Sequence, residues 1–528
     1  MAQDGEGIGP KPAPISWTSI PHKFQLFIVC SVRTVDFFQQ AALQAFMFYQ
    51  LKSFSPDADD SRISFEAGVL QGVFTAAQIF TGILWGRVMD SPRFGRKGVI
   101  LISLIGQALS CVAVAFSGSF ITAVIWRLLG GAVNATVPGA RTALSESTEK
   151  KYHSRTFLLL PLSWNIANIL GPLFSGLLSD PVGSYPGRFG PNSTFGGSQG
   201  VVWMTNFPYA VPNLFCAFAL LADALLVWLG LRETLEARKH TRDRGIELAE
   251  HISYNIRKLI FARFDYRQIS PDEQSGPDTT SDENMESGTP LTPIAPKAPE
   301  EPTTYSAAPF YKAITRNVLL LLMTVAILDF QMGGFTTLWT TFLSTARRSE
   351  EQSQAVALPF HFTGGLGFSL PKIGISMSLL GLAGIAVQLA LYPRVNARFG
   401  LLKSTSWALL VFPIPYALAP YLSLLVSVPF LLWFLLFVVA VLQIAARTFA
   451  VPGIVLLTNN ASPSPAMLGT IHGMGAATSS AFRTIGPVVA GRLFGQGLER
   501  GVVGWAWWWL SLVSLFGVVP SLWAKDGK

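Results

Sequence analysis

Long apolar runs are the feature that most constrains this chain. They recur along its whole length, about twelve in number and in two groups of about six, and each covers about 18 to 25 residues. At 1.5 Å per residue, a helix of that length crosses about 30 Å of hydrocarbon. The runs lack strand-like alternation, so helices must satisfy the backbone polar groups within lipid. The sequence therefore predicts an all-α integral membrane protein.

Composition and charge exclude several classes of protein. Only 13% of the 528 residues are charged and 50% are hydrophobic, whereas about 25% of the residues in a typical soluble domain are charged. The net charge of +8 lies in short loops and one central linker beside the apolar runs, which membrane insertion explains better than nucleic-acid binding. Cys30, Cys111 and Cys216 fall inside predicted helices, so they imply no disulfide framework.

The sequence also lacks the common signatures of catalysis. We find no phosphate loop, nucleophile elbow or cluster of metal ligands, so we expect no enzyme, no cofactor and no metal. Residues 1–21 do not resemble a cleavable signal peptide, and the first helix is expected to direct insertion.

The apolar runs define the expected domains. These are a cytosolic tail (1–23), a six-helix bundle (24–230), a cytosolic linker (231–309), a second six-helix bundle (310–523) and a cytosolic tail (524–528). Helices are expected at about 24–51, 67–85, 98–116, 120–141, 155–179, 206–229, 317–342, 373–391, 404–422, 429–457, 468–494 and 502–523. In the linker, the charged run to Phe264 predicts a helix on the membrane surface, and the composition of 271–309 predicts disorder. The bias of Lys and Arg towards the loops on one side places both termini in the cytosol.

Three short patterns repeat in the same order in both halves. The pairs are Arg93-Phe94-Gly95 with Arg398-Phe399-Gly400, Val137-Pro138-Gly139 with Val451-Pro452-Gly453, and Gly171-Pro172 plus Gly176 with Gly486-Pro487 plus Gly491. The offset is about 305 to 315 residues each time. Each pattern is weak alone, but their common order predicts a duplicated six-helix unit.

Polar side chains within the helices predict a cavity. In the first helix, Arg33, Asp36, Gln40 and Gln44 follow the spacing i, i+3, i+7, i+11, so they share one face. A second stripe, in the fourth helix, consists of Arg127, Gly131, Asn134, Pro138 and Arg141. Further intramembrane carboxylates are Asp329 and, near the end of the sixth helix, Asp223. Charged groups at such depth are costly and usually functional.

A charged segment, Trp85 to Lys97, separates the second and third apolar runs. It predicts a thirteen-residue cytosolic loop, and it resembles the signature Gly-x-x-x-Asp-Arg-x-Gly-Arg-Lys of the major facilitator superfamily. The matching residues are Gly86, Asp90, Arg93, Gly95, Arg96 and Lys97, with Ser91 and Pro92 inserted after the acid. A fungal branch of that superfamily shares the insertion. The resemblance implies a twelve-helix fold of two six-helix bundles, in which these residues gate the cytosolic side.

The fifth helix contains a second motif. Gly171, Pro172 and Gly176 resemble the antiporter pattern Gly-x-x-x-Gly-Pro-x-x-Gly-Gly, although Ala167 and Ser175 replace two of its glycines. Small residues around a proline also form ordinary helix-packing faces, so a purely structural role is the alternative.

The eleventh helix identifies a narrower group. Leu468-Gly469-Thr470-Ile471-His472-Gly473, followed by Ser479-Ser480, Arg483 and Gly486-Pro487, is similar to the signature of the zinc-induced-facilitator-like branch of fungi and plants, with His472 in place of the usual asparagine. Arg33 and Asp36 match the Arg-x-x-acid pair of that branch. Members are proton-coupled transporters of small organic molecules, including drugs, toxins and metal chelators. His472 is either a packing residue or a substrate or proton group.

The resemblance implies a proton-coupled exporter that works by alternating access, is monomeric and lies in the plasma membrane rather than the vacuolar membrane. A passive facilitator or importer, and a transport-inactive receptor, are the alternatives. Asp36 is the expected proton site, with Arg33 and Arg127 assisting and Asp329 as its rival; a static Arg33–Asp36 ion pair is the other interpretation. Residues expected to line the substrate cavity are Gln40, Asn134, Asn165, Asn168, His472 and Arg483. Asn192, in an Asn-Ser-Thr sequence, is a possible glycosylation site.

Overall fold

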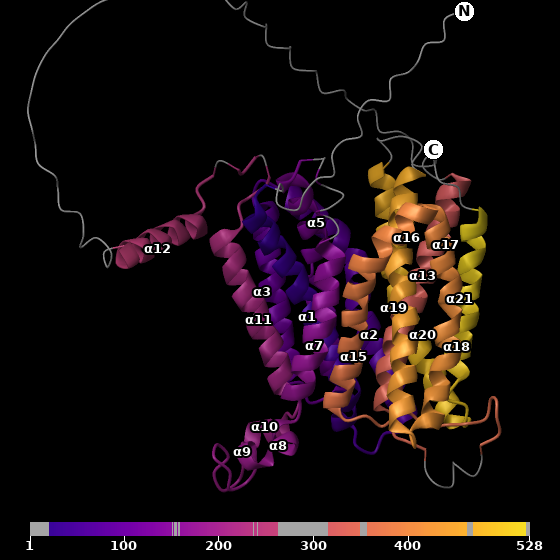
Figure 1. Cartoon of the computed structure of the whole chain (residues 1–528). Helices are drawn as coiled ribbons and strands as arrows, with labels where there is room; N and C mark the ends of the chain where they lie inside the picture. The colour runs from indigo at the N-terminus through magenta and orange to yellow at the C-terminus, as the bar shows by residue number, and fades with distance from the viewer. Residues whose placement is uncertain are drawn as a thin grey trace, which may run out of the picture.

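The computed structural model describes residues 21–149, 152, 156, 159–235, 237–239, 241–261, 315–348, 356–461 and 468–523. Two helical bundles lie side by side, one from each half of the chain (Figure 1). Ten segments in the described residues are helical, long and apolar enough to cross a membrane. Two further long helices, α7 and α20, pack between them. The expected twelve-helix fold of two six-helix bundles is confirmed.

The first bundle is built around α1, which contacts the other helices of its half. Its helices are α1 (Lys23–Phe54), α2 (Asp60–Asp90), α3 (Gly95–Ala115), α4 (Phe120–Ala132) with α5 (Thr136–Ser147), α7 (Leu159–Leu178) and α11 (Ala210–Gly230). Buried aliphatic side chains of α1, α3 and α11, such as Ile28, Leu104 and Leu220, form its core. The helix faces that meet in this core are apolar. Lipid is equally apolar, so close packing between the helices, rather than the hydrophobic effect, stabilises the bundle.

The second bundle has a more aromatic core. Its helices are α13 (Arg316–Ser344), α15 (Leu370–Ala386) continued by η4 (Val387–Leu391) and α16 (Tyr392–Phe399), α17 (Leu401–Val411) with α18 (Pro413–Leu418) and η5 (Ala419–Leu425), α19 (Pro429–Asn460), α20 (Leu468–Glu499) and α21 (Trp505–Trp523). Trp339, Phe342 and Trp507 are fully buried there, and the rings of Phe342 and Trp507 meet edge to face with centroids 5.8 Å apart. Such contacts stabilise the core beyond simple burial.

The prediction of one continuous fourth helix is wrong, because the helix is broken in the middle. Residues 133–135 are not helical, and they separate α4 from α5. Pro138 has no N–H to donate, and its ring conflicts with the carbonyl four residues earlier, that of Asn134. The Asn134 side chain occupies the break by accepting from the Thr136 N–H at 3.0 Å. Asn134 therefore lies in the break and Arg141 in α5, so the two do not share a regular helical stripe.

The charged segment between the second and third helices is also shorter than predicted. Helix α2 continues to Asp90 and α3 begins at Gly95, so only Ser91 to Phe94 form a turn. This turn, called the signature turn below, is shorter than the thirteen-residue loop because α2 extends past the apolar run into polar sequence. Gly95 has a φ of +70°, which favours glycine at this position.

Prolines and short helices account for the remaining differences. Pro413, Pro415 and Pro420 divide the predicted ninth helix into α17, α18 and η5. The stretch 180–200, between the predicted fifth and sixth helices, contains two single-turn helices, α8 (Pro181–Ser184) and α9 (Pro186–Phe189), and α10 (Val202–Asn206) follows it. The predicted surface helix exists as α12 (Arg244–Phe261), which lies across the axes of the spans (Figure 1). The stretch 271–309 lies outside the described residues.

The two bundles meet along two crossings that repeat each other. In the first, a Cβ placed on Gly68 of α2 would abut the Pro487 backbone of α20, and one on Gly491 would abut that of Ser64. In the second, a Cβ on Gly374 of α15 would abut the Pro172 backbone of α7, and one on Gly176 would lie 2.9 Å from the Leu370 carbonyl oxygen. Equivalent residues of the two sequence repeats thus make equivalent contacts.

These crossings join the bundles from one end as far as the centre of the molecule, where Asn165 of α7 contacts Gly381 and Gln388. At the end that contains Asp60, called the Asp60 end below, Tyr49 donates to the Phe368 carbonyl and Ser61 donates to Glu499. Further along α2, towards the signature turn, a Cβ on Gly82 or Gly86 would meet nothing within 4 Å. The bundles therefore contact each other at the Asp60 end and separate at the end of the signature turn.

Candidate functional site

The first bundle contributes a buried carboxylate to the centre of the molecule. Asp36 has no exposed surface, and its carboxylate accepts from Arg33 Nη1 at 2.5 Å, Asn134 Nδ2 at 3.0 Å and Gln40 Nε2 at 3.3 Å. Arg33 and Gln40 reach it because they lie three and four residues away on α1, and Asn134 reaches it because the fourth span is broken. Gln40 and Asn134, predicted to line the substrate cavity, thus bind this carboxylate.

The guanidinium of Arg33 is equally well held. It donates to Thr136 Oγ1 at 3.0 Å and lies over the Phe37 ring, 4.1 Å from its centroid. Arg127, predicted to assist it, lies in a neighbouring layer: its Nη1 donates to Gln39 Oε1 at 2.9 Å and its guanidinium covers the Phe74 ring. Arg33 therefore contacts Asp36 directly, whereas Arg127 acts on it at longer range.

The second bundle contributes the opposite side of the centre. Asp329 of α13 accepts a hydrogen bond from Ser479 and interacts electrostatically with Arg483 of α20 and Arg447 of α19. Arg483 is solvent-exposed, and its charge also acts on Arg33 in the first bundle. The predicted rivals Asp36 and Asp329 thus lie on opposing bundles, and Arg483 is within electrostatic reach of Asp329 and of Arg33, the partner of Asp36.

Helix α7 joins this centre to the second bundle. Asn165 Nδ2 donates to Gln388 Oε1 at 2.7 Å, and both side chains are buried. Gln388 lies in η4, a π-helical turn of the kind that often marks functional positions. Trp164 lies under the Arg447 guanidinium, 3.4 Å from carbon Cζ to the ring centroid. Asn168 donates to the Trp164 carbonyl on its own helix, and the His472 side chain lies outside the described residues.

The antiporter-like motif lies at an interface between helices. A Cβ on Gly171 would lie 2.9 Å from the Phe38 carbonyl oxygen of α1, and Pro172 and Gly176 contact α15. Gly486 of the second repeat abuts the Phe330 backbone of α13 in the same way. The motif therefore forms packing faces on α7, one of them between the bundles.

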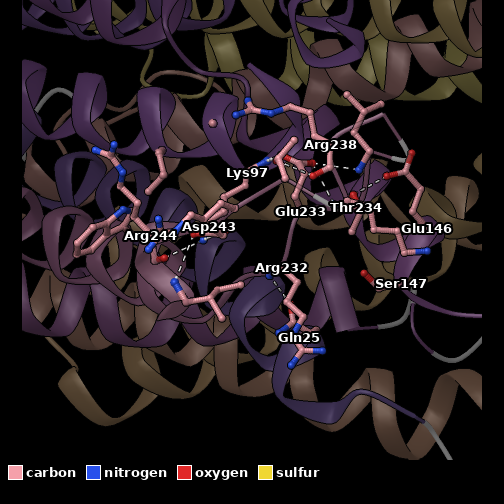
Figure 2. Close-up of a pocket in the computed structure, with 18 of the residues that line it drawn as sticks. Gln25, Lys97, Glu146, Ser147, Arg232, Glu233, Thr234, Arg238, Asp243 and Arg244 are labelled. Carbon is pink, nitrogen blue, oxygen red and sulfur yellow. Dashed lines mark hydrogen bonds and ion pairs between the residues drawn. The ribbon is translucent and has the colours of Figure 1, made fainter. Parts of the chain in front are cut away.

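The signature turn is held by the start of the central linker (Figure 2). The Glu233 carboxylate accepts from the backbone N–H groups of Arg96 at 2.9 Å and Lys97 at 3.3 Å, so it caps the first turn of α3. A side chain at Gly95 would collide with this carboxylate. Arg238 donates to the carbonyls of Arg93 and Phe94, at 2.9 and 2.7 Å.

Ion pairs at the signature turn stay within the first half of the chain. Arg96 pairs with Asp90 at 2.5 Å and with Glu146 of α5 at 3.1 Å. Lys97 pairs with Asp243 at 2.7 Å. The Asp90 side chain is 70% exposed, since the second bundle does not approach it in this conformation. Lys97, Glu146 and Asp243, together with α12, border an open pocket of about 1320 Å³.

Asn192 is exposed and follows α9, which lies with α8 at the Asp60 end of the first bundle (Figure 1). Its N–H donates to the Gly197 carbonyl at 2.6 Å, and its φ is 57°. The position is accessible, as a glycosylation acceptor must be, and glycosylation itself stays a prediction.

Arg447 and Glu233 are the main residues that the sequence interpretation missed. Arg447 lies in the middle of a long apolar run, and the cost of an arginine at that depth was a signal available in the sequence. Glu233 offered no such signal, because a carboxylate in a charged linker is ordinary. Its role depends on the chain returning to the start of α3.

Comparison with known proteins identifies the class. The model of the Major Facilitator Superfamily matches residues 27–350, and the chain belongs to this family of membrane transporters. A multidrug transporter of the superfamily from Aspergillus fumigatus, mfsB, is 30% identical over 97% of this chain and 85% of its own length. The protein Zinc induced facilitator 1 of Arabidopsis thaliana is 25% identical over 87% of this chain and 82% of its own length.

A solved structure shows the same fold. The D-xylose–proton symporter superposes with a TM-score of 0.63 over 96% of this chain and 99% of its own, at 12% identity. The resemblance read from the signature residues and from the eleventh helix is thereby confirmed, and the chain is a transporter rather than an enzyme.

We expect the substitution Asp90→Asn to leave folding intact and to reduce transport by about tenfold. The carboxylate is exposed, so its loss removes little folding energy, whereas the pair with Arg96 orients the signature turn. Transport per molecule of purified protein, measured in liposomes, provides the check. Wild-type transport at wild-type protein levels would rule out a gating role for Asp90.

Proposed function

We propose that this protein is a proton-coupled exporter of small organic molecules that works by alternating access. The observation that supports this proposal most strongly is the Asp36 carboxylate, fully buried at the centre of the molecule and held by Arg33. A carboxylate at this depth in the membrane is costly and usually functional, and the proton relays of transporters are built from such side chains. Export is coupled to the proton if the substrate binds better to the inward-open conformation and the proton binds better to the outward-open one.

The contacts between the bundles suggest the conformations of the cycle. We assign the end of the signature turn to the cytosol, because Arg87, Arg93, Arg394 and Lys403 all lie there. The structure, closed at the Asp60 end, would then be the inward-open state, ready to receive substrate from the cytosol. In the outward-open state the two glycine crossings would separate and α2 would approach α20 around Gly82.

Location and assembly complete the proposal. We place the exporter in the plasma membrane, where its action would clear the cell. We expect a monomer, since the chain supplies two bundles that each have a complete core and that pack on each other. Exclusive labelling of vacuolar membranes by a tagged chain would contradict the proposed location.

Transport by the purified protein in liposomes tests the proposal. The probes are two xanthene dyes, carboxyfluorescein and rhodamine 123, quantified chromatographically. When the liposome lumen is acidic, an antiporter accumulates its dye inside above the external concentration. When the pH gradient is collapsed, uptake stops once the internal and external dye concentrations are equal. Equilibration that never exceeds the external concentration would indicate a passive facilitator instead. Binding of a dye with no flux at all would indicate a receptor.

A further inference from the structure

The centre of the molecule holds more positive than negative charge. In the described part of the chain, the interface between the bundles brings together two carboxylates, Asp36 and Asp329, and four guanidinium groups, Arg33, Arg141, Arg447 and Arg483. Arg483 interacts electrostatically with the other three arginines, so the cations form one group that both bundles share. Like charges gathered in one place repel each other unless an anion is added.

Both carboxylates already have cationic neighbours. Asp36 binds Arg33 directly, and Asp329 lies in the fields of Arg483 and Arg447. Among the salt bridges of the described residues, none joins Arg141 to a carboxylate. The four guanidinium groups outnumber the two carboxylates, so positive charge remains available to a ligand.

The surroundings of these two cations favour a planar acid. Arg447 stacks on Trp164 at 3.4 Å, which orients the guanidinium and leaves its N–H edge available for a bidentate acid. Arg141, from α5 of the opposite bundle, is exposed. An aromatic ring stacked on one guanidinium, with Arg483 in the same group of cations, suits a molecule with a flat apolar part and an acidic group.

We propose that the substrates are organic anions, of the aromatic carboxylate or sulfonate class, which bind between Arg141, Arg447 and Arg483. This inference rests on the proposed transport function and adds its substrate class. An organic cation of the same size would enter a region of net repulsion, so charge selects against it.

Binding of the two xanthene dyes separates the charge classes. Wild-type protein in phosphatidylcholine nanodiscs, whose lipids carry no net charge, is titrated against carboxyfluorescein and rhodamine 123 by fluorescence polarisation. We expect the anionic dye to bind at least about tenfold more tightly, which corresponds to the loss of one charge-assisted contact. Tighter binding of rhodamine 123, or no saturable binding of carboxyfluorescein, would overturn the inference.

Variants at Arg141 assign the preference to this site. Arg141→Gln should weaken carboxyfluorescein binding by about tenfold, and Arg141→Lys, which keeps the charge, should stay within about threefold of wild type. Arg500→Gln is the matched control, because Arg500 lies beside Trp505 at the Asp60 end. Equal affinities of all three variants would overturn the inference. The experiments distinguish failure of the two proposals. Preference for the anionic dye without pH-driven accumulation would refute proton-coupled export. Accumulation of rhodamine 123 alone, driven by pH, would refute the anion site.

Discussion

Asp36→Asn should abolish accumulation of the transported dye against its concentration gradient and leave exchange at equal pH. Asparagine preserves the shape of the side chain and keeps one oxygen that can accept from Arg33, but its NH2 group replaces the oxygen that accepts from Asn134, and it cannot bind or release a proton. The expected loss of pH-driven transport is at least about a hundredfold, since the coupling ion no longer has a site. The measurement compares uphill uptake with exchange in the same liposomes.

Asp57→Asn is the matched control for that result. Asp57 is an exposed carboxylate in the turn before α2, so its loss should leave both activities unchanged. If Asp36→Asn retained uphill transport, the Arg33–Asp36 contact would be a static ion pair, and Asp329 would be the next carboxylate to substitute. A variant that loses exchange as well would show that Asp36 also orders the substrate site.

Gly72→Leu should shift the protein towards the state that is open at the Asp60 end. A Cβ on Gly72 would lie 2.6 Å from the Thr484 carbonyl oxygen and 3.1 Å from Val488 Cγ2, so a leucine forces α2 and α20 apart. Overpacking of this kind costs about 1–3 kcal/mol, which changes the ratio of the two conformations by about 5- to 150-fold.

Labelling of a cysteine at Ser64 reports that shift. Ser64 is fully buried at the crossing, where its backbone abuts Gly491, so Ser64→Cys should react slowly with an impermeant maleimide when the end is closed. In a background without Cys30, Cys111 and Cys216, Gly72→Leu should raise the labelling rate. Gly82→Leu, on the same helix but where a Cβ would meet nothing within 4 Å, should lower it or leave it unchanged. Equal increases in both variants would contradict alternating access around these crossings.

The fold was largely predictable because lipid restricts what an apolar run of membrane-spanning length can do. Helix ends were less predictable, since helices such as α2 continue into polar sequence where water replaces lipid. The break before Pro138 was not predicted, because the hydrophobic pattern continues through it. The proline was visible in the sequence, but it does not by itself show that the helix breaks. Repetition of Gly171-Pro172 as Gly486-Pro487 did predict a duplication, and the two glycine crossings now give it a structural basis.

The candidate site was predictable only within single helices. Arg33 and Asp36 lie one turn apart, so their contact followed from helical spacing. The contacts of Asp36 with Asn134, and of Arg447 with Trp164, join segments that are distant in sequence. Helical periodicity shows on which face of its own helix a residue lies, but it does not show which other helix, or which face of that helix, the residue contacts. The excess of arginines at the interface therefore emerged only from the packing of the two bundles.

Proton movement driven by substrate is the most direct test of the account. Liposomes that contain the purified protein are loaded with the transported dye and diluted into weakly buffered medium without it, and an electrode follows the external pH. Outward flow of the dye should draw protons inward, so the medium should become more alkaline with wild-type protein and remain unchanged with Asp36→Asn. Dye efflux from wild-type liposomes without any change in external pH would contradict proton coupling.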